Sequence, residues 1–263
     1  MKRTAGAICI LAVCLFPLLA LAEELTIVGT GSGPPILKAI GEAFTERNPD
    51  IRIVVPRSIG SGGGIKAVGN DEYLVARVAR EIKESERHYG LSYTPIALVP
   101  IVFYASNNVK VGNLTGEQVL GIYSGKSFNW AAAGGHNGRI RVVRRQDGDS
   151  SLGVLLGTFP GFSDIVLTPV SRTTHSDPET IELVRGVEDA IAFGAYSDVK
   201  DLPLTVFSLD GVSPAASDYP YYGVLALVYK EENRTGSLAE FIDFALSSEA
   251  TAAIQRSGGL PVQ

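Results

Sequence analysis

The chain has 263 residues, of which 45% are hydrophobic, 19% charged and 8% aromatic. This balance is typical of a globular protein and excludes an intrinsically disordered one, and the length indicates one or two domains. The 23 basic residues are outnumbered by 28 acidic residues, which gives a formal net charge of −5. Nucleic-acid binding requires a basic surface, so no nucleic-acid partner is expected, although a local arginine cluster around a small anion is compatible with this charge.

Residues 1–22 have the three-part pattern of a secretory signal peptide. Lys2 and Arg3 provide a basic start, an apolar run follows, and Ala20-Leu21-Ala22 forms a small-residue cleavage site. Pro17 within the run argues against the alternative, a retained membrane anchor. The pattern therefore predicts export through a cleaved signal peptide.

Both cysteines, Cys9 and Cys14, lie inside this segment. The mature chain from Glu23 is therefore expected to have no disulfide, no cysteine-based metal site and no thiol catalyst. It retains 21 basic and 28 acidic residues, a net charge of −7. A chain of this size can bury a core large enough to fold without disulfides.

The mature chain opens with two strand–turn–helix units. Residues 25–29 form a short apolar run before a glycine-rich turn, and Pro34 opens a segment whose apolar spacing predicts a helix. Residues 51–55 are β-branched and alternate in polarity, which predicts a strand. A second glycine-rich turn then precedes a predicted helical segment at 65–68. This order is typical of α/β architecture.

The alternation continues to the C-terminus. Thr115 and Gln118 have the spacing of a capping box and predict the start of a helix. A further helix is predicted over 177–187, and one long helix over 238–256. Strands are predicted over 96–104, 139–143, 190–196, 204–208 and 222–229.

Three turns carry residues suited to anion binding. They are Gly29-Thr30-Gly31-Ser32-Gly33, Ile59-Gly60-Ser61-Gly62-Gly63-Gly64, and Arg144-Arg145-Gln146-Asp147-Gly148-Asp149-Ser150-Ser151. Each precedes a predicted helix, whose first N–H groups are free and whose dipole favours an anion. The serines add hydroxyl donors, and Arg145 adds a charge-assisted fork.

These turns would form a cage of donors for a tetrahedral oxyanion if they converge. Each of them alone also has a purely structural interpretation as a tight strand-to-helix turn. The dinucleotide-binding and Walker fingerprints do not fit, because Pro34 stands near the expected third glycine and no Gly-Lys-Ser/Thr follows either glycine turn.

The motifs together resemble those of periplasmic phosphate-binding proteins of ABC uptake systems, within the type II periplasmic-binding-protein superfamily. The similarity extends over nearly the whole mature chain. Its elements are Gly29-Thr30-Gly31-Ser32, Gly60-Ser61-Gly62-Gly63-Gly64-Ile65, Leu114-Thr115 through Trp130, Arg145-Gln146-Asp147-Gly148-Asp149-Ser150-Ser151, and the closing Phe241 to Leu246 with Gly259-Leu260-Pro261-Val262.

The resemblance implies an α/β protein of two lobes, joined by a two-strand hinge, with the ligand in the cleft between them. One lobe would comprise residues 23–100 and 225–263, and the other residues 101–224. The expected ligand is inorganic phosphate, and the expected partner is an ABC permease at the membrane. The chain would act in the periplasm as a monomer, without enzyme activity and without a cofactor. The implied ligand-binding residues are Ser32, Gly33, Ser61, Arg80, Arg145, Asp149, Ser150 and Ser151.

Two departures from the family pattern concern the ligand. Phosphate carriers commonly place an aspartate after the second turn, where it accepts the proton of hydrogen phosphate. This chain has Arg77 and Arg80 in that stretch instead, and either could reach the ligand or lie on the surface. Asp149 stands where the family usually has serine. We hypothesise that Asp149 supplies the missing acceptor, because an ionised carboxylate only accepts hydrogen bonds. The alternative is that Asp149 caps the following helix.

Other functions are less well supported by the sequence. His88, His136 and His175 are too far apart in sequence to predict a metal site. A serine hydrolase would need a nucleophile elbow, and Gly31-Ser32-Gly33 lacks the outer glycine spacing. Sulfate, molybdate and tungstate are alternative ligands, and a sensory receptor module is an alternative role of the same fold.

Overall fold

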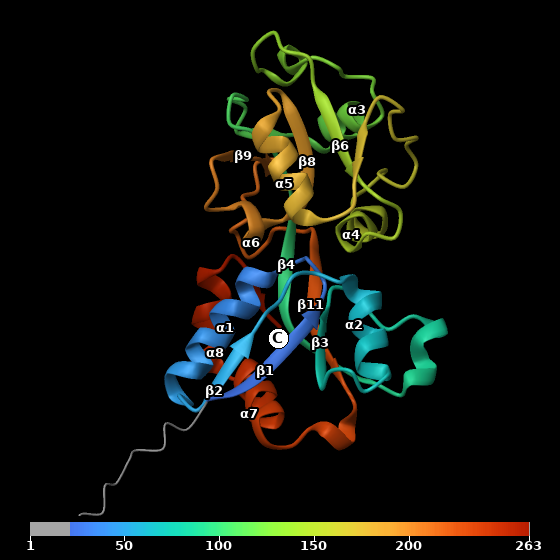
Figure 1. The fold of residues 1–263 in the computed structure, drawn as a ribbon. Helices are drawn as coiled ribbons and strands as arrows, with labels where there is room; N and C mark the ends of the chain where they lie inside the picture. The colour runs from blue at the N-terminus through green and yellow to red at the C-terminus, as the bar shows by residue number, and fades with distance from the viewer. Residues whose placement is uncertain (1–21, 263) are drawn as a thin grey trace, which may run out of the picture.

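The computed structural model describes residues 22–262. The predicted signal peptide, apart from Ala22, and both cysteines lie outside the described residues. The chain forms two α/β lobes, one above the other in Figure 1, around a continuous sheet of order β2-β1-β3-β11-β4-β8-β6-β7. No helix within residues 22–262 is long and apolar enough to cross a membrane.

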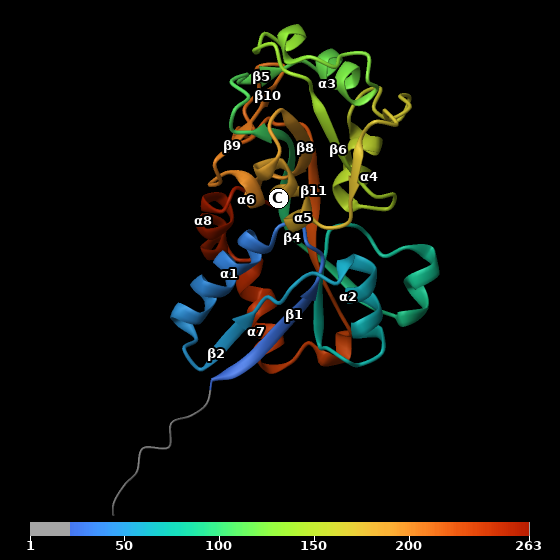
Figure 2. The same cartoon turned by 45° about the horizontal axis from the view of Figure 1, so that its top comes forward.

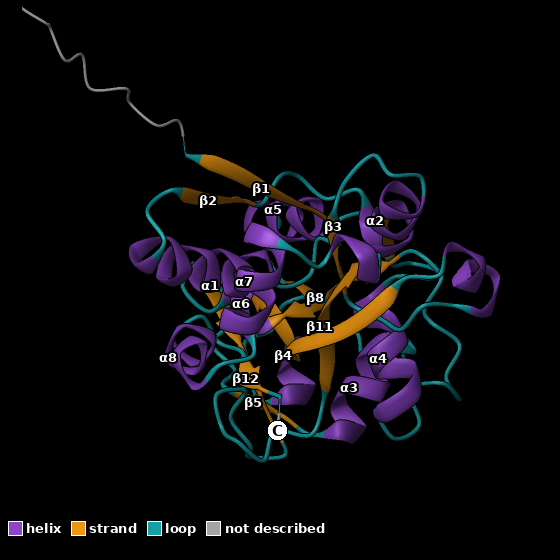
Figure 3. Cartoon of the chain, turned by 90° about the horizontal axis from the view of Figure 1, so that it is seen from below, coloured by secondary structure: helices purple, strands orange, loops and turns teal. Residues whose placement is uncertain are grey.

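The first lobe contains the N-terminal and C-terminal elements. β1 (Glu23–Gly29) pairs in parallel with β2 (Ile51–Val54) and β3 (Val75–Val78), and β11 (Tyr222–Tyr229) pairs antiparallel with β3. Helices α1 (Pro34–Arg47), α7 (Gly236–Ala245) and α8 (Ser248–Arg256) pack together, apart from α2 (Gly60–Gly69), as Figure 3 shows from below. The short 3-10 helices η1 (Glu84–Tyr89) and η3 (Glu231–Asn233) and strand β12 (Leu260–Pro261) complete this lobe.

The second lobe is built on β8 (Ala190–Ala195), β6 (Arg141–Arg145) and β7 (Arg172–Thr174). β6 pairs in parallel with both neighbours. Its helices are α3 (Gly116–Tyr123), α4 (Ser150–Thr158), α5 (Asp177–Gly186) and the one-turn α6 (Tyr196–Val199). The remaining elements are η2 (Trp130–Ala133), β5 (Asn113–Leu114), β9 (Leu204–Val206) and β10 (Ser208–Leu209).

Two strands connect the lobes. β4 (Ser92–Ser106) pairs with β11 up to Pro100 and with β8 from Ile101 onward. β11 brings the chain back to the first lobe, and both strands run between the lobes in Figure 2. Lobe boundaries at residues 100 and 224 remain a prediction.

Apolar side chains fill both lobes. In the second lobe four aromatic rings pack edge-on or tilted around Phe103, namely those of Tyr123, Phe159, Phe162 and Phe193, at centroid distances of 5.5–6.3 Å. The sequence spacing that predicted the first helix is confirmed, because Ile36, Leu37, Ile40 and Phe44 are all buried on α1. These cores hold the helix starts in fixed positions.

Three segments differ from the sequence prediction. The predicted helix over 238–256 is two helices, because the chain leaves α7 at Leu246 and Ser247 is extended at the start of α8, where serine is favoured. The glycines of the second turn belong to α2 itself. A Cβ on Gly64 would lie 2.9 Å from the Cβ of Ala76, so glycine permits close packing of α2 on β3. β6 begins at Arg141 rather than at residue 139, because Arg139 is bridged to Asn129.

Candidate anion-binding site

A cavity of about 480 Å³ lies where the predicted turns of the two lobes meet. Five of the eight predicted site residues line it, namely Ser61, Arg80, Arg145, Asp149 and Ser150. Ser32, Gly33 and Ser151 do not. The remaining lining residues are Thr30, Gly31, Ser58, Ile59, Gly60, Gly62, Gly63, Lys83, Gln146, Gly148, His175, Ser176 and Asp177.

The first turn reaches the cavity through Thr30 and Gly31 rather than through Ser32. Gly29 ends β1 at φ 127°, and a Cβ there would collide with the carbonyl oxygen of Arg77, so this position requires glycine. Ser32 is 3% exposed, and its backbone N–H donates to Thr30 Oγ1 at 3.2 Å. Gly33 caps α1 in the left-handed conformation. Ser32 and Gly33 therefore shape this turn behind the cavity wall.

The second turn presents the N-terminus of α2 to the cavity. Residues Gly60, Ser61, Gly62 and Gly63 are the first four of the helix, whose N–H groups have no partner within the helix. Ser58 Oγ accepts from the backbone N–H of Gly60 at 3.1 Å, and Ser61 Oγ accepts from the N–H of Ala79 at 3.1 Å. The Ser61 hydroxyl hydrogen remains available to a ligand.

The two arginines after the second turn have different roles. Arg77 on β3 is fully buried and donates to the carbonyl oxygens of Thr30 and Pro56, each at 2.8 Å, and to that of Ile27. Burial lowers its pKa to about 10. Arg80 instead lines the cavity, where Glu86 accepts from both of its terminal nitrogens at 2.8 and 2.7 Å. Arg77 therefore braces the turn, whereas Arg80 lies on the cavity wall; contact of Arg80 with the ligand stays a prediction.

Arg145 is the central cation of the second lobe. It is 3% exposed, at the end of β6. Its Nε and Nη2 donate to Asp149 Oδ2 at 3.0 and 2.7 Å, and its Nη1 donates to Thr180 Oγ1 at 2.7 Å. Burial lowers the pKa of Arg145, but the neighbouring carboxylates of Asp177 and Asp149 raise it by more, so the pKa is raised overall. Three of its five N–H donors are thus used within the protein, and two remain for a ligand.

Asp149 is already engaged on both oxygens. Oδ2 accepts from Arg145, and Oδ1 accepts from the N–H of Leu152 at 3.0 Å as the N-cap of α4. The helix-cap alternative raised by the sequence is the arrangement observed. Ser150 follows on the cavity wall, whereas the buried Oγ of Ser151 has no partner among the described residues.

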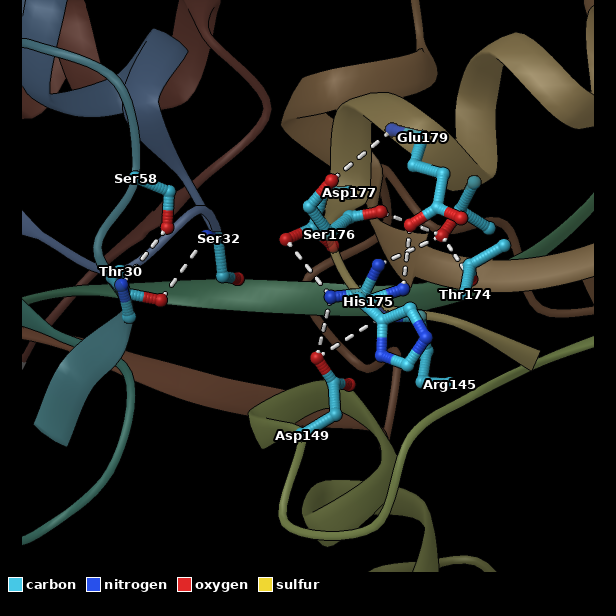
Figure 4. Close-up of polar contacts among 12 residues, drawn as sticks. Thr30, Ser32, Ser58, Arg145, Asp149, Thr174, His175, Ser176, Asp177 and Glu179 are labelled. Carbon is cyan, nitrogen blue, oxygen red and sulfur yellow. Dashed lines mark hydrogen bonds and ion pairs between the residues drawn. The ribbon is translucent and has the colours of Figure 1, made fainter. Parts of the chain in front are cut away.

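Asp177 is a cavity residue that the sequence analysis missed. It was seen only as part of a helix start, and it is indeed the first residue of α5, after the N-cap Ser176. Its side chain is 12% exposed, and its Oδ2 lies 3.5 Å from Arg145 Nη2. Burial raises its pKa, and Arg145 partly offsets that rise. Figure 4 shows Asp177, Arg145 and Asp149 together, with Thr30 and Ser32 opposite them.

Asp177 also reaches the first lobe. A Cβ on Gly31 would lie 2.8 Å from Asp177 Oδ2, so the carboxylate of one lobe abuts the glycine turn of the other. No signal in a single sequence places residue 177 beside residue 31. The contact depends on how β6, β8 and α5 are arranged in the second lobe.

Histidine appears at the rim of the cavity rather than in a metal site. His175 Nδ1 contacts Gln146 Oε1 at 2.7 Å, and its backbone N–H donates to Glu179 Oε2 at 2.7 Å. Within residues 22–262 no three histidine, cysteine or acidic side chains are grouped closely enough to hold a metal ion.

Comparisons with known proteins match this architecture. Residues 19–249 match the family model described as PBP superfamily domain. The phosphate-binding protein PstS of Bacillus subtilis is 28% identical over 248 residues, which cover 91% of this chain and 81% of that protein. The PstS of Borreliella burgdorferi is 23% identical over 258 residues, covering 90% of both chains.

Solved structures agree with the sequence relatives. A candidate phosphate ABC transporter substrate-binding protein of Clostridium perfringens, solved with bound phosphate, is 31% identical and superposes with a TM-score of 0.79. The alignment covers 92% of this chain and 100% of that chain. An ABC-type phosphate transport receptor of Vibrio cholerae, 24% identical, covers 91% and 100% of the two chains with a TM-score of 0.60, and supports the fold.

Proposed function

The chain belongs to the periplasmic-binding-protein (PBP) superfamily and has its two-lobed fold, and on that premise we propose that it captures inorganic phosphate between its lobes for an ABC permease. The observation that carries this proposal is the convergence of Ser61, Arg80, Arg145 and Ser150 on one cavity. These residues come from both lobes and are far apart in sequence. The named relatives are phosphate-binding proteins, which supports the same ligand.

The proposed ligand contacts are hydrogen bonds to a dehydrated anion. The free N–H groups of α2, the hydroxyls of Ser61 and Ser150, and the two remaining N–H donors of Arg145 can each bind a phosphate oxygen. Arg80 adds charge at the mouth of the cavity. Ser151 follows Ser150 directly, and its buried Oγ has no hydrogen-bond partner in the part of the chain that the structure describes, whereas a buried hydroxyl normally has one. Ser32 and Gly33 contribute indirectly, because they shape the first turn behind the cavity wall.

Asp177 favours phosphate over the alternative anions. Among residues 22–262 its one ion-pair partner is Arg145, at 3.5 Å, and Asp149 holds that arginine more closely, at 2.7 Å. A fully ionised anion such as sulfate would be repelled by this carboxylate, whereas hydrogen phosphate can donate its proton to it. We therefore propose that Asp177, rather than Asp149 as the sequence suggested, accepts the hydrogen bond from the proton of hydrogen phosphate.

The proposed activity is ligand binding, without a catalysed reaction. The relatives are named as a phosphate-binding protein and as a phosphate ABC transporter substrate-binding protein. Among the described residues, the Ser61 hydroxyl contacts the Ala79 N–H and the His175 ring contacts Gln146, so these two side chains are not hydrogen-bonded to each other as a nucleophile and its base would be. We propose export by the N-terminal peptide, action as a monomer in the periplasm, and closure of the lobes on the ligand.

Calorimetric titration of the mature chain tests this proposal. The protein is stripped of ligand and titrated with phosphate, sulfate, molybdate and tungstate at about pH 8. Tight binding of phosphate alone is the expected result. Tight binding of sulfate, or no heat with any of the four, would contradict it.

A further inference from the structure

A second crevice between the lobes contains a half-buried aspartate with one buried carboxylate oxygen, which phosphate capture does not use directly. It has a volume of about 440 Å³ and lies between the start of α1 and the helices α5 and α6. Asp198 of α6 lines it, and its Oδ2 is buried without a hydrogen-bond partner among the described residues. α1 belongs to the first lobe and α6 to the second, and the two helices are in contact. Asp198 therefore lies on the seam between the lobes.

The surroundings of Asp198 favour its neutral form. Burial raises its pKa well above the usual range, and Asp177 of α5 raises it further. The backbone N–H of Gly33, Arg145 of β6 and Lys38 of α1 oppose this rise without cancelling it. Arg145 is already committed to Asp149, and Lys38 is exposed. Glu182 and Arg185 of α5 are the other charged residues of the crevice, one of each sign.

We propose that Asp198 takes up a proton when the lobes close on phosphate and releases it when they separate. The inference rests on the proposed function, because it requires the lobes to close around the anion. In the closed seam the carboxyl group is shielded from water by α1, whereas separation of α1 and α6 would hydrate it and favour the ionised form. The captured anion and the proton on Asp198 are thus linked through the same movement.

The sign of the linkage follows from these two environments. Asp198 binds its proton more tightly in the closed form than in the open form. At a pH between the pKa values of the two forms, closure therefore takes up a proton. The gain in phosphate affinity is fully present below the open-form value and is lost as the pH rises through the closed-form value. For one linked proton the loss is at most about tenfold per pH unit. The surplus of acidic side chains at the seam would in this way assist release as the pH rises.

The test compares wild-type protein with Asp198→Asn. Asparagine keeps the shape of the side chain and an oxygen facing Gly33, but it cannot take up the proton. Phosphate is titrated calorimetrically between about pH 6 and pH 8, in pairs of buffers with different ionisation enthalpies, which gives the number of protons taken up. Asp201→Asn is the matched control, because Asp201 lies just beyond α6 and is paired with Lys200 at the surface.

The wild type and Asp201→Asn are expected to take up more protons per phosphate than Asp198→Asn, by up to about one, and to lose affinity more steeply with pH. The protonation of phosphate itself contributes equally to all three. Equal proton uptake in wild type and Asp198→Asn would overturn the inference and leave phosphate capture intact. If the wild type binds no phosphate, the proposed function fails, and the inference fails with it.

A second measurement does not depend on the variant. Carbon-13 NMR of wild-type protein labelled at aspartate carboxyl carbons follows each group through a pH titration. One buried carboxyl group should stay protonated to a higher pH in the phosphate-bound form than in the free form. Identical aspartate titrations in the two forms would contradict the inference.

Discussion

Asp177 and Asp149 lie on either side of Arg145, yet their carboxylates are placed for different tasks. Asp149 accepts three hydrogen bonds, two from Arg145 and one from the N-terminus of α4. Asp177 is 3.5 Å from the same arginine and abuts Gly31 of the opposite lobe. Of the two carboxylates that line the cavity, Asp177 therefore keeps more acceptor capacity for a ligand.

Replacement of Asp177 by asparagine should change which anion binds. The amide presents an N–H donor where the carboxylate presented an acceptor, so phosphate affinity should fall at least about tenfold and sulfate affinity should rise. Calorimetric titration with both anions gives the ratio of the two affinities. Asp201→Asn, which removes an exposed carboxylate from the same lobe, should leave that ratio unchanged. An unchanged ratio in Asp177→Asn would refute the acceptor role.

Replacement of Arg145 by lysine keeps the charge but removes the fork. Lysine cannot hold Asp149 through two nitrogens, reach Thr180 and bind the anion at once, so phosphate affinity should fall by about ten- to a hundredfold. Equilibrium titration measures the loss, and circular dichroism checks the fold. Arg144→Lys is the matched control, because Arg144 does not line the cavity and donates only to Thr173. A similar loss in both variants would contradict a ligand role for Arg145.

At the scale of elements, the starts of α3 and α5 were predictable from the sequence, whereas α2 begins at Gly60 within the second glycine turn rather than near residue 65. Thr115 and Gln118 do form a capping box, and α5 begins after Ser176 as its polar residues indicated. These signals are local, because a cap depends on residues three or four positions apart. The break between α7 and α8 was missed. Apolar residues recur at helical spacing on both sides of it, and Ser247 alone gives little indication that a new helix begins there.

The composition of the cavity was only partly predictable, because it depends on contacts between distant elements. Arg77 and Arg80 are three residues apart in the sequence, but Arg77 lies buried on β3, whereas Arg80 follows the strand and lines the cavity. Asp177 resembles any acidic residue in the first turn of a helix. Ser32 fits the family motif, yet its position behind Thr30 follows from the left-handed Gly33 that starts α1.

The bracing of the first two turns by Arg77 can be tested through stability. Arg77→Met fills a similar volume but removes the donors to Thr30, Pro56 and Ile27, so the free energy of unfolding should fall by on the order of 3 kcal/mol. Urea unfolding measures this change. Arg47→Met on α1 is the control, since its ion pair with Glu249 is exposed and should contribute little. Equal stability of the two variants would show that the buried contacts do not brace the turns.

For the whole molecule, ligand capture should stabilise the folded state by mass action. Phosphate at a hundred times its dissociation constant should add about 2.7 kcal/mol to the free energy of unfolding, which corresponds to about 5–11 °C in Tm for a chain of this size. Thermal unfolding with phosphate and with sulfate at equal ionic strength measures the effect. A shift of the same size with sulfate would indicate a general salt effect rather than capture.

The two lobes contribute complementary groups, and neither contains the full site. The first lobe supplies the N-terminus of α2, Ser61 and Arg80, and the second supplies Arg145, Ser150 and Asp177. Because β4 and β11 both run between the lobes, movement at these strands would change the distance between the two sets. The same movement would expose or cover Asp198 at the seam.

The most direct test of this account is a crystal structure of the mature protein grown with phosphate. The account predicts one phosphate between the starts of α2 and α4, within hydrogen-bond distance of Ser61, Arg145 and Asp177. Phosphate bound to one lobe alone, or an Asp177 carboxylate turned away from it, would contradict the account.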